Sequence, residues 1–160
     1  MYAYIAIAVL ILIAGFVLRA AKGAPRTLDT LSGALADLLK RGYDGGFLII
    51  SISYSRRFLQ IRKYIRQPGN YGIELAFPKA KWSLSCFDAV RDLCRRRGLD
   101  SRVSDEGVLD FLYADFGTNV SEANDCVKEI LADIFGVSSK ATLFVKLENA
   151  TVEDELIETP

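Results

Sequence analysis

Residues 2–18 form an unbroken run of apolar and small side chains, and this run restricts the fold more than any other feature of the chain. An α-helix rises about 1.5 Å per residue and the hydrocarbon core of a bilayer is about 30 Å thick, so the run is just long enough to span a membrane. A basic residue directly after it can extend the span by reaching the headgroups, and tyrosines suit the opposite interface. The predicted anchor is residues 1–19, defined by Tyr2, Tyr4, Leu10, Leu12, Phe16, Leu18 and Arg19.

Two other interpretations of this run fit the sequence less well. A cleaved signal peptide carries basic side chains before a shorter apolar core, whereas no basic side chain precedes Tyr2. A buried core helix is usually shorter or has a polar face, which this run lacks. Arg19, Lys22 and Arg26 follow the run, so the positive-inside rule places the C-terminal side in the cytoplasm. We therefore expect a single-pass membrane protein, as in a bacterial inner membrane, with a cytoplasmic C-terminal domain.

The remainder of the chain has the length of one domain. The chain has 160 residues, and roughly 120 residues beyond an anchor can bury a single core without disulfides. Residues 20–26 contain a glycine and a proline and are predicted to be a juxtamembrane linker. The predicted cytoplasmic domain covers residues 27–149, and an acidic tail covers residues 150–160.

Hydrophobic periodicity divides this domain into helices and strands. Leucines at helical spacing predict a first helix from Thr27 or Thr30 to Gly42, and two further helices are predicted at 85–97 and 119–136. Alternating apolar residues predict strands at 47–54, 57–66, 71–77, 101–104 and 108–116, and residues 143–147 allow a final strand. The predicted fold is α+β, in the order α-β-β-β-α-β-β-α with a further β, and consists of a mainly antiparallel sheet backed by helices.

The order of elements from Thr27 through Gly136 resembles the fold of class I type III secretion chaperones and the related YbjN-type proteins. The resemblance is one of topology. It implies protein binding, usually as a dimer, and it carries no catalytic residue over to this chain. An alternative interpretation begins later, because residues 71–147 also follow the ferredoxin-like order β-α-β-β-α-β, with the hairpin of residues 47–66 added in front.

Charge is divided unevenly along a chain whose net charge is zero. Residues 19–102 contain 17 Lys and Arg against 7 Asp and Glu, and residues 103–160 contain 3 against 13. A basic domain near the cytoplasmic leaflet is attracted to anionic lipid or to an acidic partner. Nucleic acid fits less well, because the isoelectric point is near 6.3. The candidate contact residues are Arg57, Arg62, Tyr64, Arg66, Arg95, Arg96 and Arg97.

The sequence shows no recognisable catalytic or cofactor-binding motif. It contains no histidine, the commonest general base and metal ligand. Cys86, Cys94 and Cys126 lack metal-site spacing and are predicted to be free thiols. The apolar stripes of their helices predict burial of Cys94 and Cys126, and burial is expected to raise the pKa of Cys94. We expect no metal and no cofactor.

The function expected from these features is that of a non-catalytic accessory, assembly or scaffolding subunit. Such a subunit would be anchored in the membrane and would bind protein subunits of a larger membrane complex, and it could also form homodimers. The alternatives are an enzyme acting at the membrane surface through carboxylates or a cysteine, and a lipid-sensing or signalling module.

Overall fold

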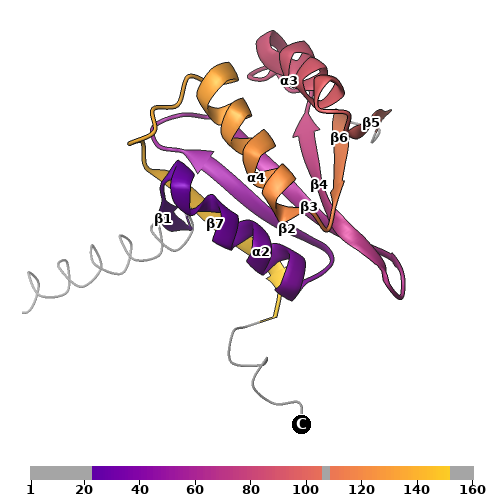
Figure 1. Ribbon diagram of the computed structural model, residues 1–160. Coiled ribbons are helices and arrows are strands. Elements are labelled where there is room, and N and C mark those ends of the chain that lie inside the picture. Colours follow the sequence, from indigo (N-terminus) through magenta and orange to yellow (C-terminus); the bar gives the residue numbers. More distant parts are fainter. Residues whose placement is uncertain (1–22, 106–108, 152–160) are drawn as a thin grey trace, which may run out of the picture.

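The computed structural model describes residues 23–105 and 109–151, and within these ranges it confirms an α+β fold (Figure 1). Three helices, α2 (Leu31–Arg41), α3 (Leu84–Arg96) and α4 (Val120–Glu129), accompany a seven-stranded antiparallel sheet. A π-helical segment, η2 (Ile130–Ile134), continues α4, and a 3-10 turn, η1 (Leu28–Thr30), precedes α2. The strands are β1 (Ala24–Arg26), β2 (Gly42–Ile52), β3 (Phe58–Gln67), β4 (Asn70–Pro78), β5 (Asp100–Asp105), β6 (Asp110–Gly117) and β7 (Leu143–Ala150).

Both ends of the chain extend beyond the described residues. The predicted anchor at residues 1–19 lies outside them, and the acidic tail is described only as far as Thr151. No helix within residues 23–105 and 109–151 is long and apolar enough to cross a bilayer. The linker predicted for residues 20–26 is wrong in its last part, because Ala24–Arg26 pairs with β7 as the edge strand β1. Pro25 is tolerated there because an edge strand does not need every backbone N–H.

The sheet has the strand order β1-β7-β2-β3-β4-β6-β5, and all of the neighbouring strands are antiparallel. The predicted hairpins are confirmed: β2 pairs with β3, and β3 pairs with β4 through a turn in which Gly69 has a φ of 82°. The ferredoxin-like alternative for residues 71–147 is wrong, because it requires β7 to lie beside β4. The β2–β3 hairpin instead lies between these two strands.

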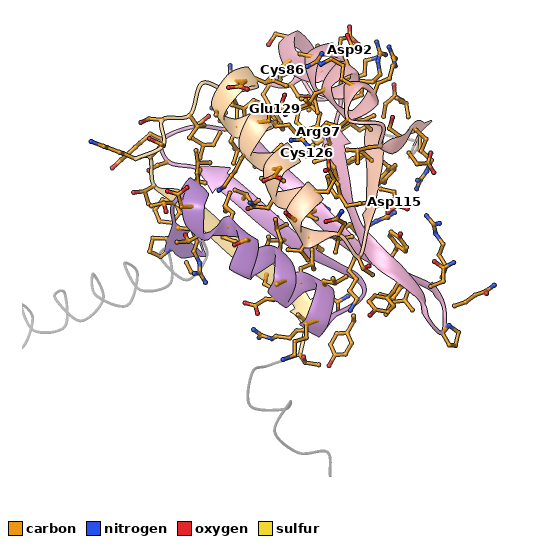
Figure 2. The ribbon with its side chains drawn as sticks, viewed as in Figure 1. Cys86, Asp92, Arg97, Asp115, Cys126 and Glu129 are labelled. Carbon is orange, nitrogen blue, oxygen red and sulfur yellow. The ribbon has the colours of Figure 1, made fainter. Side chains whose placement is uncertain are left out.

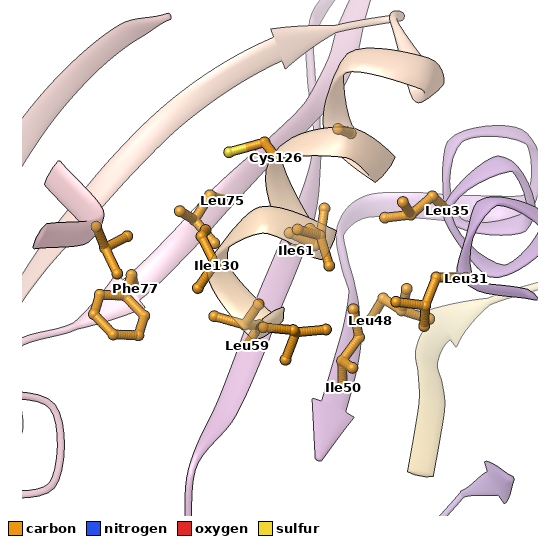
Figure 3. Close-up of a cluster of buried hydrophobic side chains, with 14 of the residues drawn as sticks. Leu31, Leu35, Leu48, Ile50, Leu59, Ile61, Leu75, Phe77, Cys126 and Ile130 are labelled. Atoms are coloured by element: carbon orange, nitrogen blue, oxygen red, sulfur yellow. The ribbon is translucent and has the colours of Figure 1, made fainter. Parts of the chain in front are cut away.

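All three helices cover one face of the sheet and share a single hydrophobic core with it (Figures 1 and 3). Helix α2 packs beside α4 and against β2, β3 and β7, while α3 packs against β5 and η2. Every second residue of the central strands points into this core, as the alternating pattern predicts. The fully buried side chains include Leu31, Leu35, Leu38, Leu48, Ile50, Leu59, Ile61, Ile73, Leu75, Phe77 and Ile130.

Strand β2 begins earlier than the strand predicted at residues 47–54. Residues 42–46 already belong to it, and its register is irregular between Gly42 and Phe47. Gly45 has a φ of 73°, and the Asp44 carboxylate accepts a hydrogen bond from the backbone N–H of Ile65 at 2.8 Å. The start of β2 is therefore held against the end of β3 at Ile65.

Candidate functional site

The face of the sheet that points away from the helices, called here the outer face, carries apolar and aromatic side chains. Antiparallel sheets with one solvated face usually place polar residues there. On this sheet, the alternation that buries Leu48 and Ile50 directs Phe47 and Ile49 to the outer face. Register pairs place Phe144 of β7 and Tyr113 of β6 on the same face. The described residues place no helix over these side chains.

An apolar hollow of about 680 Å³ lies on the outer face above β2, β7 and the turn between β2 and β3. Ile49 and Phe144 line it together with Tyr54, which is fully exposed and has a φ of 58°. A positive φ is rare for a bulky residue, and such strain is concentrated at functional sites. Lys146 and Glu148 form an ion pair at the same hollow. We call this site the apolar hollow.

A second depression, of about 340 Å³, lies at the far end of β3 and is mainly basic. We call it the arginine pocket; it is lined by Asp44, Gly45, Arg62, Lys63, Tyr64, Ile65, Arg66, Glu74 and Arg102. Its four cationic side chains outnumber its two carboxylates. Only one of the cations, Lys63, is buried, and its Nζ donates to the backbone carbonyl of Leu39 at 2.6 Å, near the end of α2.

Glu74 is the buried centre of this pocket. Its side chain is 1% exposed although it lies on the outer face. The Arg62 Nε donates to Glu74 Oε1 at 3.0 Å, and Arg62 Nη2 contacts the same oxygen. The Arg102 Nη2 lies 3.5 Å from Glu74 Oε2. Both guanidinium groups also lie 4.8 Å from the centre of the Tyr113 ring, so the carboxylate and the ring together fix the two arginines.

Tyr64 and Asp115 form a second polar pair beside Glu74. The Tyr64 hydroxyl lies 2.8 and 2.9 Å from the two carboxylate oxygens of Asp115, and the Arg66 guanidinium stacks 4.4 Å from the Tyr64 ring centre. Gly72 makes this approach possible, because a β-carbon there would lie 2.6 Å from the Tyr64 hydroxyl oxygen. The glycine thus lets a β3 side chain reach across β4 to β6.

We expect Tyr64 to ionise only near pH 12. Burial, followed by the hydrogen bond to Asp115 and the charge of that carboxylate, raises the pKa of Tyr64 to about 12. Because the folded state holds the proton more tightly, the resulting stabilisation is complete below about pH 10 and is lost as the pH rises towards 12. Titration of the ring-carbon NMR signal measures this pKa, and Asp115→Asn should lower it. A midpoint near 10 in the unmodified protein would contradict the described contact.

The other predicted contact residues lie in different environments. Arg57 stacks 5.6 Å from the centre of the Phe135 ring, away from the arginine pocket. Arg95 pairs with Asp92 within α3, and Arg96 is exposed. Arg97 joins α3 to α4 through ion pairs with Glu122 at 2.8 Å and Glu129 at 3.1 Å, so it serves the packing of the two helices (Figure 2). Only Arg62, Tyr64 and Arg66 of the predicted set line one site.

Four residues of the arginine pocket and its border were missed by the sequence analysis: Glu74, Arg102, Tyr113 and Asp115. Glu74, Tyr113 and Asp115 occupy strand positions that alternate with core residues, and this alternation was the available signal. Arg102 has no such neighbours, because Val103 beside it is exposed. Alternation could not identify β4 and β6 as neighbours, because Glu74 and Asp115 are separated by the whole of α3 and β5.

The three cysteines are free, as predicted, and all three are buried, as was predicted for Cys94 and Cys126. Cys94 and Cys126 lie at the interface of α3 and α4, where their side chains are hydrogen-bonded to each other. This bond lowers the pKa of Cys94 despite its burial, whereas the same bond and burial raise the pKa of Cys126. The raised pKa predicted for Cys94 is therefore wrong, because the sequence did not show its thiol neighbour. No group of three potential metal-binding side chains occurs in the described part of the chain.

Comparison with known proteins does not assign the chain to a family. The chain matches no protein-family model, no curated protein and no solved structure.

Proposed function

We propose that this chain is a membrane-anchored accessory subunit that binds another protein through the outer face of its sheet. Residues 1–19 provide the anchor, the domain of residues 27–149 lies in the cytoplasm, and the partner is a protein subunit of a larger membrane complex. In that role, the chain assists the assembly of the complex or acts as a scaffold within it.

The observation that carries this proposal is the apolar hollow on the outer face. A solvated sheet face should be polar, yet Ile49 and Phe144 line a hollow of about 680 Å³. Exposed apolar surface bordered by charged groups is typical of protein interaction sites. The exposed Tyr54 ring at its rim is of the residue type that often contributes most to binding energy.

The arrangement of charges suits a partner segment with apolar and acidic residues. Lys146 and Arg56 line the apolar hollow, and Arg62, Arg66 and Arg102 line the arginine pocket on the same sheet. Charges at the edge of an interface mainly direct association and select the partner, whereas buried apolar contacts supply most of the affinity. The partner expected here therefore inserts apolar side chains at β2 and β7 and directs acidic ones towards β3.

Membrane fractionation followed by purification in mild detergent tests both parts of the proposal. The full chain should remain in the membrane fraction after alkaline carbonate washing, because this washing removes proteins held by electrostatic contacts and an apolar anchor does not depend on them. Deletion of residues 2–18 should release the chain. A single stoichiometric partner should purify with the full chain, and Phe144→Asp should reduce its recovery at least about tenfold. Asp125→Lys on the exposed side of α4 is the control and should have no effect.

Two results would contradict the proposal. Extraction of the full chain by carbonate would show that residues 1–19 do not anchor it in the membrane. Undiminished recovery of the partner with a folded Phe144→Asp variant would show that the outer face is not the binding surface. Tight binding to anionic vesicles without any protein partner would favour the lipid-sensing alternative instead.

A further inference from the structure

Strand β5 forms one edge of the sheet, and no other strand of the described residues pairs with its free side (Figure 1). It is 6 residues long, whereas the opposite edge, β1, has 3 residues and contains Pro25. An edge strand presents a row of unpaired backbone N–H and C=O groups, to which another strand can be added. Short length and a proline protect β1 against such pairing, and neither device protects β5. The β5 edge is therefore the place where this sheet can be extended.

Asp100 lies on this edge beside a charge of its own sign. In the register of β5 and β6 it is directly opposite Asp115 on the outer face, and like charges in such a pair repel each other. Asp115 is bound by the hydroxyl of Tyr64 and pairs with Arg66. Asp100, in contrast, is exposed and forms no ion pair within the described part of the chain. A cationic side chain on a strand added beside β5 would offset this repulsion.

The sequence of β5 supplies such a cation if the strand pairs with a copy of itself. Arg102 follows Asp100 by two residues, so both side chains lie on the outer face. Two identical strands that run antiparallel about Ser101 place each Asp100 directly opposite Arg102 of the other copy. Arg102 contacts Glu74 and the Tyr113 ring, yet its side chain is 50% exposed. Part of its guanidinium group therefore remains accessible to a second carboxylate.

Other registers that keep the two outer faces on the same side fit less well. Pairing about Arg102 places the two Arg102 side chains directly opposite each other, which is unfavourable for like charges. Pairing about Val103 places Asp100 opposite a position beyond the end of β5, so its carboxylate again lacks a partner. Pairing about Ser101 also places Val103, which is 48% exposed, opposite Leu99 of the other copy. Charge and apolar contact therefore select the same register.

From this geometry we propose that β5 pairs with β5 of a second copy of this chain, antiparallel about Ser101, so that two seven-stranded sheets form one continuous sheet. The apolar hollow stays open in this dimer, because β2 and β7 are distant from β5 in the strand order. The paired segments span only about 15 Å at about 3.3 Å per residue, so the interface is smaller than a standard one and the dimer is reversible. This inference does not depend on the proposed function.

Disulfide crosslinking of the full chain in mild detergent tests the proposed register. Directly opposite residues of antiparallel strands have Cα atoms about 4.5–5.5 Å apart, which is within the range of a disulfide. Val103→Cys is the matched control for Ser101→Cys, because it lies on the same strand and face but its two copies would be about 13 Å apart. On mild oxidation, non-reducing electrophoresis should show at least about tenfold more dimer from Ser101→Cys than from Val103→Cys. The unmodified chain, whose cysteines are buried, gives the background.

The charge of Asp100 provides a second test in the Ser101→Cys background. Asp100→Lys should reduce the crosslinked dimer at least about fivefold, because it replaces attraction to Arg102 of the other copy by repulsion. The same change should not lower the free energy of unfolding, since it removes the repulsion from Asp115 within the chain. Asp125→Lys on α4 is the control and should leave the dimer unchanged. Equal crosslinking from positions 101 and 103, no dimer above the background, or an undiminished dimer with Asp100→Lys would overturn the inference.

Discussion

Replacing Phe77 with alanine is expected to lower the free energy of unfolding by about 3–5 kcal/mol, because large-to-small changes of a buried phenylalanine remove both apolar burial and packing. Phe77 is completely buried in β4. Its ring centre lies 5.7 Å from that of Trp82, 6.0 Å from that of Phe87 and 6.2 Å from that of Phe135. One side chain thus joins the sheet to α3 and to the end of η2. A domain of this size is usually stable by only about 5–15 kcal/mol, so the loss is large.

Chemical denaturation followed by tryptophan fluorescence measures this effect, since Trp82 lies in the same aromatic cluster. Phe77→Leu keeps most of the volume and should cost less than half as much. Tyr54→Ala is the surface control and should change the stability by less than about 0.5 kcal/mol. A small effect of Phe77→Ala, comparable with that of Tyr54→Ala, would show that this cluster does not form.

Replacing Arg62 with methionine is expected to destabilise the domain by about 3 kcal/mol, at the lower end of the range for a broken buried ion pair. Glu74 is 1% exposed and loses its closest partner, whereas the Arg62 side chain is 36% exposed, so solvent already weakens the pair. Among the described residues, Arg102 then remains as the ion-pair partner of the buried carboxylate, with its Nη2 3.5 Å from Glu74 Oε2. The double variant Arg62→Met with Glu74→Gln should recover part of the loss, because no unpaired charge stays buried.

Local sequence patterns predicted the elements of this fold because each has a local physical cause. Asn119 was expected to begin a helix, and its side chain accepts a hydrogen bond from the N–H of Glu122 at 3.1 Å. Gly42 ends α2 as expected, and the Pro68–Gly69 turn joins β3 to β4. Alternation and helical spacing are properties of single segments, so they can be read without the rest of the chain.

Strand order and the arginine pocket could not be read in the same way, because they depend on segments that are distant in sequence. The pairing of β7 with β2 places the last strand of the domain beside the first hairpin. Arg62 and Arg102 meet at Glu74 only because β3 and β5 lie one and two strands from β4. Pro25 indicated a linker by its type, while its pairing with Phe144 shows that it lies in an edge strand.

The central proposal is that a partner protein binds the outer face of the sheet, and site-specific photocrosslinking in intact membranes tests it most directly. A photoreactive residue replaces Gln60, which is opposite Ile49 on the outer face, or Asp125, which is exposed on α4. We predict that the protein that purifies stoichiometrically with the chain is captured from position 60 and is not captured from position 125. Capture from position 125 alone, or equally from both positions, would contradict the proposal.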